Sequence, residues 1–287
     1  MNRTTHWQCG GVRFDLAAKP LVMGIVNVTP DSFSDGGQFF DPTRAVEQAL
    51  QLAAEGADVL DVGGESTRPG ATPVSEAEEL ARVIPVIRGL AKQTEVALSI
   101  DTMKAGVAQA AMDAGAVIVN DVSGFRDPAM IRIVSRFGAG AVVMHMPGLP
   151  TTMNDNPQYG DIVRDVVDYL RQQTEAMLQA GVACDAIAVD PGIGFGKFTQ
   201  HSLTLLAHLD AFGELGYPLC LGVSRKGFLG RITGREPAER MPASLAVACR
   251  AVVEGTARIL RVHDVGPTVD MVMMMTAIAA ARSGEPR

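Results

Sequence analysis

The sequence predicts a single-domain α/β protein folded as a (β/α)8 barrel, the TIM-barrel architecture. Three observations point to this class. Eight short apolar runs recur along the chain, segments of helical period lie between them, and the 287 residues suit a barrel, which typically needs about 250. Eight strands that alternate with eight helices favour a closed barrel, and an open doubly wound sheet is the alternative.

The eight apolar runs are the predicted strands. They are rich in β-branched residues and almost continuously hydrophobic, as is typical of parallel strands covered on both faces. They are LVMGIVNV (21–28), DVLDVG (58–63), VALSID (96–101), VIVNDV (117–122), AVVMH (141–145), IAVD (187–190), PLCLGVS (218–224) and RILRVH (258–263).

The segments between these runs carry the signals of helices. Asp41 is the expected N-cap of the first, with Pro42 at the first helical position. The second opens with Ser75 and Glu78, the spacing of a capping box. A regular apolar stripe over 159–180 ends at Gly181. Further helices are expected at 104–114, 127–137, 200–215, 240–255 and 266–282.

The chain shows no linker, low-complexity tract or charge block that would divide it. Residues 1–20 are expected to form a short N-terminal extension, a hairpin that closes the barrel floor, and residues 21–287 the barrel itself.

Composition indicates which partners the protein can bind and in which cell compartment it is expected. A net charge of −7, a pI near 5.3 and the lack of a basic stripe argue against nucleic acid. The four cysteines are scattered without a CxxC pair, which predicts reduced thiols in a cytoplasmic protein. The N-terminus lacks an apolar signal region, and MVMMMTAIAAA is too short for a membrane span.

Polar side chains follow every predicted strand. Because the active site of such a barrel lies at the carboxyl ends of its strands, these groups are expected to share one rim. The positions are Asn27, Asp61, Asp101, Asn120, Asp121, His145, Asp190, the triplet Ser224, Arg225 and Lys226, and then Arg261 and His263.

Each of these residues also has an ordinary structural interpretation. Asp and Asn commonly end strands as turn or cap residues, and a single histidine such as His145 is more often structural than a ligand. The glycine-rich PGIGFGK (191–197) fits neither the Walker pattern nor GxGxxG, so a tight turn is a possible explanation. The functional hypothesis depends on the whole set, because polar groups follow all eight runs.

The residue types are suited to a planar polar ring that carries a pyrophosphate. Arg68, Arg261 and His263 are donors for phosphate oxygens, and Asn27 and Asp101 offer oxygens to a hydrated Mg²⁺. A carboxylate at Asp190 and an amide at Asn120 would match the donor and acceptor edge of a heterocycle, and Lys226 a ring carbonyl or nitrogen.

Several motifs together resemble the dihydropteroate synthase family. They are MGIVNVTPDSFSDGG, DVGGESTRPGA, SIDT, NDVSG, MHM, DPGIGFGK, GVSRKGFLG and RVHDV, in order from residue 21 to 265. The resemblance implies a (β/α)8 barrel, usually a homodimer. It also implies an enzyme that joins 4-aminobenzoate to 6-hydroxymethyl-7,8-dihydropterin diphosphate, giving 7,8-dihydropteroate and pyrophosphate in folate synthesis.

The resemblance also implies roles for single residues. The pterin-binding set is Asp101, Asn120, Met144, Asp190, Phe195, Gly222 and Lys226, with Asp61 supporting it. The diphosphate set is Asn27, Arg68, Arg261 and His263, with Asn27 as the Mg²⁺ ligand. The aminobenzoate set is Phe33, Thr67, Pro69, Phe195 and Ser224, the surface for which sulfonamides compete.

The chemistry is expected to be a dissociative, SN1-like displacement. The predicted catalytic residues are Lys226, Asp101, Asp35, Arg261 and His263. The carboxylates would stabilise a ring-delocalised methylene cation, while the cationic groups and Mg²⁺ neutralise the leaving pyrophosphate. Loops 29–37 and 63–73 would exclude water.

Three residues depart from the family pattern: Pro147 after His-Met, Phe198 after GFGK, and Ser202 after His201. They put loop conformation and inhibitor response in question, while the reaction stands. The rival hypotheses are a pterin-dependent corrinoid methyltransferase, a non-catalytic pterin-binding protein and a phosphate-binding barrel isomerase. The first would not need the SRKGFLG, RVH and NVTPDSFSDGG motifs, the second should have lost Lys226 or Arg261, and the third lacks a Glu/His acid–base pair.

Overall fold

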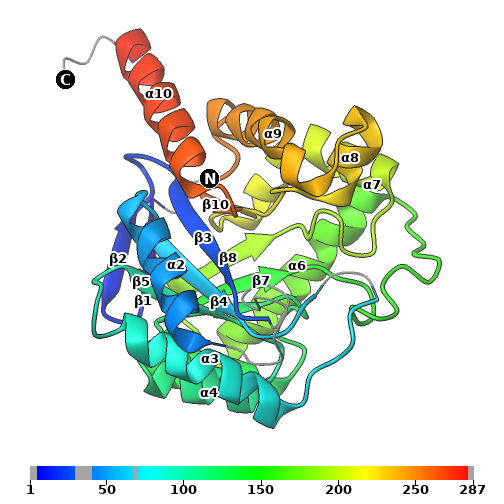
Figure 1. Ribbon diagram of the computed structural model, residues 1–287. Coiled ribbons are helices and arrows are strands. Elements are labelled where there is room, and N and C mark those ends of the chain that lie inside the picture. The colour runs from blue at the N-terminus through cyan, green and yellow to red at the C-terminus, as the bar shows by residue number, and fades with distance from the viewer. Residues whose placement is uncertain (1–4, 30–40, 68–69, 284–287) are drawn as a thin grey trace.

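Eight parallel strands form the barrel that the sequence predicts (Figure 1). The computed structural model describes residues 5–29, 41–67 and 70–283. The strand order is β8-β7-β6-β5-β4-β3-β10-β9, and a parallel bridge between Val189 and Leu219 joins the two ends of this sheet. The closed barrel is therefore favoured over the open doubly wound sheet.

The strands coincide with the eight apolar runs. They are β3 Leu21–Asn27, β4 Val59–Gly63, β5 Ala97–Asp101, β6 Ile118–Asp121, β7 Gly140–Met144, β8 Ile187–Asp190, β9 Cys220–Leu221 and β10 Ile259–Val262. The largest difference is β9, which is far shorter than the predicted 218–224. Pro218 has no N–H for the ladder, and beyond Leu221 the chain leaves the sheet.

Helices surround the barrel between the strands. They are α2 Pro42–Ala54, α3 Glu76–Leu90, α4 Ala105–Asp113, α5 Pro128–Phe137, α6 Ile162–Gln179, α7 Thr199–Ala207, α8 Gly227–Thr233, α9 Met241–Val253 and α10 Val265–Ser283. The two predicted N-caps are confirmed. The Asp41 carboxylate accepts from the Thr43 N–H at 2.8 Å, and the Ser75 hydroxyl accepts from the Glu78 N–H at 3.2 Å.

One helix prediction was wrong in detail, and one helix was missed. The predicted helix 200–215 breaks at His208 into α7 and a 3-10 segment, Leu209–Leu215, and the break lets Leu209 and Phe212 both face the core. Helix α8 was not predicted, because a seven-residue segment with two glycines is too short and too weak a helix former to show a period.

The barrel interior is divided into an apolar floor and a polar mouth. Alternate residues of the strands point inward, and their first members form one buried apolar layer that includes Met23, Val59, Ile118, Val142 and Ile259. The N-terminal hairpin packs under this layer. Its strands are β1 His6–Cys9 and β2 Val12–Asp15.

Trp7 anchors the hairpin to the floor. Its ring is fully buried in the floor layer, and its indole N–H donates to the Ala186 carbonyl at 2.8 Å. The hairpin thus closes the end of the barrel from which the strands start, leaving the opposite end for a site (Figure 1).

Candidate functional site

The inward-facing series of the floor continues to the mouth, where its members become polar. Inward-facing residues recur at every second position of a strand. The polar ones lie two or four residues after the floor residues Met23, Val59, Ala97, Ile118 and Ala188. Cross-strand pairing sets Asp101 beside Asn120 and Met144 beside Asp190. The positions on this series at the mouth are Asn27, Asp61, Asp101, Asn120, Met144, Asp190, Gly222, Arg261 and His263.

Arg261 connects the carboxylates of this group. Its Nε donates to Asp61 Oδ2 and its second terminal nitrogen to Asp101 Oδ2, each at 2.6 Å. Asn120 donates its amide N–H to the same Asp61 oxygen at 3.0 Å. The predicted supporting residue Asp61 therefore lies fully buried beneath Arg261 and Asn120.

Three buried polar atoms at this depth lack a hydrogen-bond partner within residues 5–29, 41–67 and 70–283. They are Asp61 Oδ1, Ser99 Oγ and Asp101 Oδ1. Buried polar atoms in folded proteins are nearly always paired, so a cluster of three indicates a place where polar groups of a ligand or solvent are held.

Burial and neighbouring charges shift the ionisation of the mouth residues. Burial raises the pKa of Asp101 to about 7, although the Arg261 charge opposes this. Burial likewise raises the pKa of Asp190, against the Lys226 charge, and lowers the pKa of Lys226 to about 8, against the Asp190 charge. Burial disfavours the charge on Arg261, but the carboxylates of Asp61 and Asp101 raise its pKa above the usual value.

The glycine-rich segment after β8 is a tight turn that shapes the mouth. Gly192, Gly194 and Gly196 have φ values of +67°, +83° and +57°, which explains the GxGxG spacing. The Gly192 N–H donates to Asp190 Oδ1 at 2.7 Å. The turn brings the Phe195 ring within 4.2 Å of Lys226 Nζ, which donates to the Ile193 carbonyl. The segment is therefore a tight turn, as one of the two interpretations of the sequence held, and it lies beside the candidate site.

Ser224 and His263 lie together at the rim. The Ser224 hydroxyl accepts from the His263 backbone N–H at 3.1 Å and lies 3.0 Å from His263 Nδ1. The next residue, Arg225, has φ +58° and donates from Nε to Asp264 at 3.1 Å. These contacts tie the segment after β9 to the segment after β10.

Thr67 lies half-buried in the segment after β4. The base of this segment is held by Lys104, whose amino group bonds Glu65 and lies 2.5 Å from Glu79 Oε2. Four predicted site residues, Phe33, Asp35, Arg68 and Pro69, lie outside the described residues.

The structure distinguishes residues that face the candidate site from neighbours in the sequence that do not. Asp121 faces away from the site and serves its turn, because its carboxylate accepts from the backbone N–H groups of Ser123 and Phe125 at 2.7 and 2.9 Å. Ser99 and Lys197 were not predicted. Ser99 could have been found from its inward position two residues before Asp101. Of the family departures, Phe198 is exposed and Ser202 is buried.

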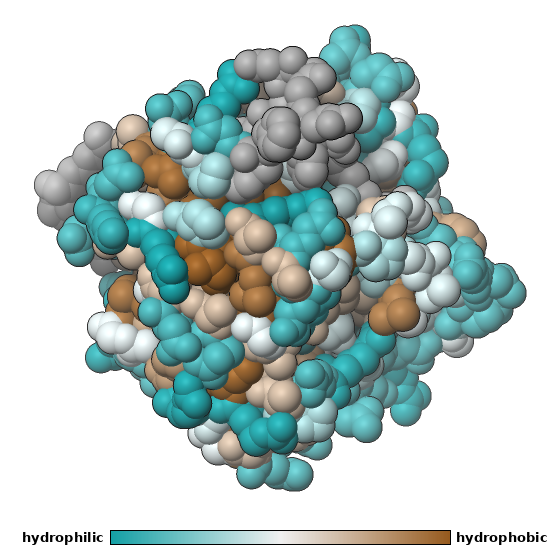
Figure 2. All heavy atoms as spheres, turned by 60° about the horizontal axis from the view of Figure 1, so that its bottom comes forward, coloured by the Kyte–Doolittle hydropathy of each residue, from teal (hydrophilic) through white to brown (hydrophobic). Residues whose placement is uncertain are grey.

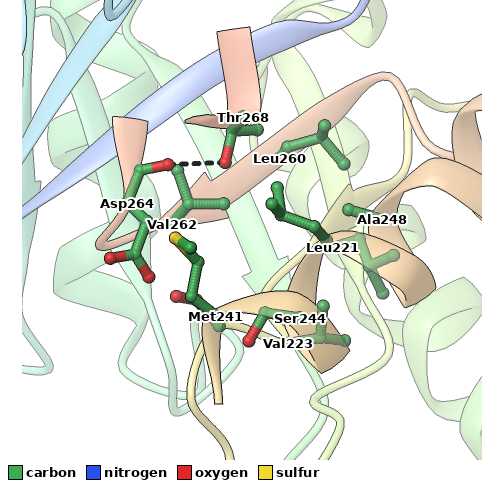
Figure 3. Close-up of a pocket in the computed structure, with 11 residues that line it drawn as sticks. Leu221, Val223, Met241, Ser244, Ala248, Leu260, Val262, Asp264 and Thr268 are labelled. Carbon is green, nitrogen blue, oxygen red and sulfur yellow. Dashed lines mark hydrogen bonds between the residues drawn. The ribbon is translucent and has the colours of Figure 1, made fainter. Parts of the chain in front are cut away.

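A separate small cavity lies behind the barrel wall (Figure 3). Its walls come from the outward faces of β9 and β10 and from α9 and α10, and include Leu221, Leu260 and Ala248. It shares Ser224 with the mouth, but its mainly apolar lining does not suit a polar ring.

The fold and mouth define a barrel enzyme that binds a planar polar ring with an anionic substituent. Residues 23–263 match the model of the pterin binding enzyme family. Dihydropteroate synthase of Escherichia coli strain K12 is 42% identical over 275 residues, covering 96% of this chain and 97% of that protein. The chain belongs to the dihydropteroate synthase family.

Solved structures of this family agree in fold. Xanthomonas albilineans dihydropteroate synthase with 4-aminobenzoic acid is 47% identical with a TM-score of 0.90, covering 96% of this chain and 99% of that one. Yersinia pestis dihydropteroate synthase in a sulfonamide complex is 40% identical, also with a TM-score of 0.90 and the same coverage.

Proposed function

We propose that this protein is a dihydropteroate synthase, which joins 4-aminobenzoate to 6-hydroxymethyl-7,8-dihydropterin diphosphate and forms 7,8-dihydropteroate and pyrophosphate. The observation that carries the proposal is the set of buried polar side chains at the barrel mouth, which includes Asp101, Asn120, Asp190 and Lys226. The family membership and the names of the relatives support it.

The pterin ring would bind among the deepest of these groups. Asp190 and Asn120 are both buried, so their hydrogen bonds to ring N–H and ring acceptor atoms are shielded from water. Lys226 would donate to the ring carbonyl or a ring nitrogen, and Met144 and Phe195 would pack on the ring faces beside Gly222.

The diphosphate would bind toward the rim. Arg261 uses Nε and one terminal nitrogen for carboxylates, and a guanidinium has five N–H donors, so others remain for phosphate oxygens. His263 and, by the resemblance, Arg68 would complete the anion site.

Magnesium is part of the same proposal. In the described part of the chain no cluster of three His, Cys, Asp or Glu residues could hold a metal. This donor set fits Mg²⁺ that is carried mainly by the substrate, because Mg²⁺ keeps several waters and needs few protein ligands beside phosphate oxygens. Asn27 would supply one oxygen, and the bound ion would neutralise charge on the diphosphate.

The reaction breaks the bond between the pterin methylene carbon and the diphosphate oxygen and forms a bond from that carbon to the amine nitrogen, which loses one proton. The site favours a dissociative path. The Asp101 carboxylate and, by the resemblance, Asp35 would favour the methylene cation, while Arg261 and His263 hold the departing anion. Lys226 keeps the ring oriented. The aromatic amine is neutral near pH 7, so positioning by Phe195, Thr67 and Ser224, with Phe33 and Pro69, is what it needs.

A homodimer is also proposed. Helices α9 and α10 expose large apolar side chains at Val253, Met273, Met274 and Ile278, and Met273 is 63% exposed. Figure 2 brings the bottom of Figure 1 forward and so shows a different face, where hydrophobic residues are exposed among hydrophilic ones. Sedimentation equilibrium would give twice the chain mass for a dimer and the chain mass of 30.3 kDa for a monomer.

A cytoplasmic location is proposed from the thiols. All four cysteines lie in the described part of the chain and are free, and Cys9 and Cys220 are buried. Among the helices that the structure describes, none is long and apolar enough to cross a membrane.

The decisive experiment measures pyrophosphate release by the purified protein with Mg²⁺ and pterin diphosphate, with and without 4-aminobenzoate. Release that depends on aminobenzoate, with pteroate identified by mass spectrometry, supports the proposal. Tight pterin binding without turnover would instead indicate a non-catalytic binding protein. No pterin binding would reject the proposal altogether.

A further inference from the structure

Lys197 is a buried lysine that neither the proposed chemistry nor the substrate sets use. Its side chain ends in the wall of the barrel mouth and is only 3% exposed. Its amino group lies 2.9 Å from His145 Nδ1, 3.2 Å from the His145 carbonyl oxygen and 3.0 Å from the Phe195 carbonyl oxygen. A lysine is rarely this buried, because removing its charge from water is costly.

The surroundings of Lys197 suit an ammonium group. An ammonium has three N–H donors, which match these three acceptors, whereas a neutral amine has only two. These acceptors work against burial, which lowers the pKa of Lys197 well below its usual value; the charge of Lys226 lowers it further, while Asp190 raises it. Burial and the charge of Lys197 lower the pKa of His145 to about 2, so His145 stays neutral and its Nδ1 lone pair can accept.

The two carbonyl groups belong to two different segments of the mouth. His145 directly follows Met144 at the end of β7, and Phe195 lies in the turn after β8. Met144 and Phe195 pack in one small cluster with Met146, Met153 and Val122. Lys197 therefore links the backbone beside Met144 to the backbone of Phe195.

Other contacts make this link stiff. The Tyr159 hydroxyl donates to the Gly196 carbonyl at 2.9 Å, and the His145 ring packs edge-on against Tyr169 with centroids 4.9 Å apart. These contacts hold the backbone on which the Phe195 ring is carried, and the ring itself faces Lys226. A shift of the Phe195 carbonyl would move the ring that Lys226 contacts.

We propose that Lys197 is a positioning residue of the pterin site: by bonding the carbonyl oxygens of His145 and Phe195, it fixes the positions of Met144 and Phe195 relative to each other, and the pterin ring would pack against both. This inference rests on the proposed function, because it names the pterin as the ring. Lys197 would act through these two carbonyl groups and not by contacting substrate.

The test replaces Lys197 by methionine, which keeps the unbranched stem of the side chain but lacks the amino group and so removes all three hydrogen bonds. Pterin diphosphate with Mg²⁺ is titrated into the protein by calorimetry without aminobenzoate, and steady-state constants are measured for both substrates. We expect pterin affinity to fall roughly tenfold or more, equal to about 1.4 kcal/mol. KM for pterin diphosphate should rise in parallel, and KM for aminobenzoate should change much less.

The matched control is Met177→Ala, which opens a cavity at a fully buried position in α6. It should lower stability without changing the ratio of the two KM values. Equal losses for both substrates in Lys197→Met, or unchanged pterin affinity, would overturn the inference while leaving an active wild-type enzyme and hence the proposed function intact.

A second variant covers the case in which Lys197→Met does not fold. Lys197→Gln keeps two N–H donors on a shorter side chain and should show the same preference for the pterin KM with a smaller loss. If neither variant folds, Lys197 is a structural residue and the inference is rejected.

Discussion

Replacing Asp61 by asparagine removes one negative charge from the barrel mouth and keeps the shape of the side chain. In the native protein the Asp61 carboxylate is fully buried and accepts from Arg261 at 2.6 Å and from Asn120 at 3.0 Å. In the variant, Asp101 is the remaining carboxylate bonded to Arg261.

The size of the effect follows from this remaining bond. Removing one partner of a buried ion pair typically costs about 3–5 kcal/mol, because a charge is left uncompensated. Here Asp101 still compensates Arg261, so the loss should be that of one charge-assisted hydrogen bond, about 1.5–3 kcal/mol of unfolding free energy.

A second readout concerns Asp101. Its pKa is raised to about 7, first by burial, and the negative charge of Asp61 contributes to the rise. Loss of that charge lowers the Asp101 pKa. If pterin binding needs the Asp101 carboxylate, affinity falls as the pH drops through this pKa, and in Asp61→Asn the fall moves to lower pH.

Urea unfolding measures the loss of unfolding free energy. Calorimetric titration of pterin diphosphate across about pH 5.5 to 8.5 measures how affinity depends on pH around the Asp101 pKa of about 7. Asp113→Asn, at an exposed position on α4, is the isosteric control and should change neither. The reasoning is refuted if Asp61→Asn loses less than about 0.5 kcal/mol, the range of ordinary surface substitutions, or if the acid limb moves to higher pH.

Three further predictions concern separate parts of the molecule. Asp190→Ala should abolish pterin diphosphate binding in calorimetry, since it removes a buried carboxylate that is expected to bind the ring edge; normal affinity would reject that assignment. Phe33→Leu, at a position outside the described residues, should raise KM for aminobenzoate and Ki for sulfonamides more than KM for pterin diphosphate, and equal changes would contradict the assigned pocket. Trp7→Ala should lower the unfolding free energy by about 3–5 kcal/mol while kcat of the folded enzyme is retained, because Trp7 lies at the floor; a loss of kcat without a loss of stability would contradict this.

The strands were predictable because both their faces are apolar over most of their length, which shows in the sequence as continuous hydrophobic runs. The positions at the strand ends were predictable for a different reason, because side chains alternate along a strand and residues two apart share a face. Asp121 shows the limit: it adjoins Asn120 in sequence, yet it serves a turn, and the difference is one of side-chain direction.

The partners within the site could not be predicted from the residues alone. Arg261 bonds two carboxylates that lie 200 and 160 residues away in the chain, and only closure of the barrel brings them together. Lys197 and His145 are 52 residues apart and meet because β7 and β8 are neighbours. Helix α8 escaped prediction for a local reason, its short length and two glycines.

Because the hairpin closes the floor of the barrel, the site is open only at the mouth, where the strands end. A ring that reaches Asp190 and Asn120 must travel inward past the rim, where Ser224 and Thr67 lie, and the joined product must leave by the same route. An aminobenzoate that settled first at the rim would stand in the path of the larger pterin. The apolar packing around Trp7 closes the end remote from the site, so both substrates would have to enter by the rim, and we predict that pterin diphosphate binds before aminobenzoate.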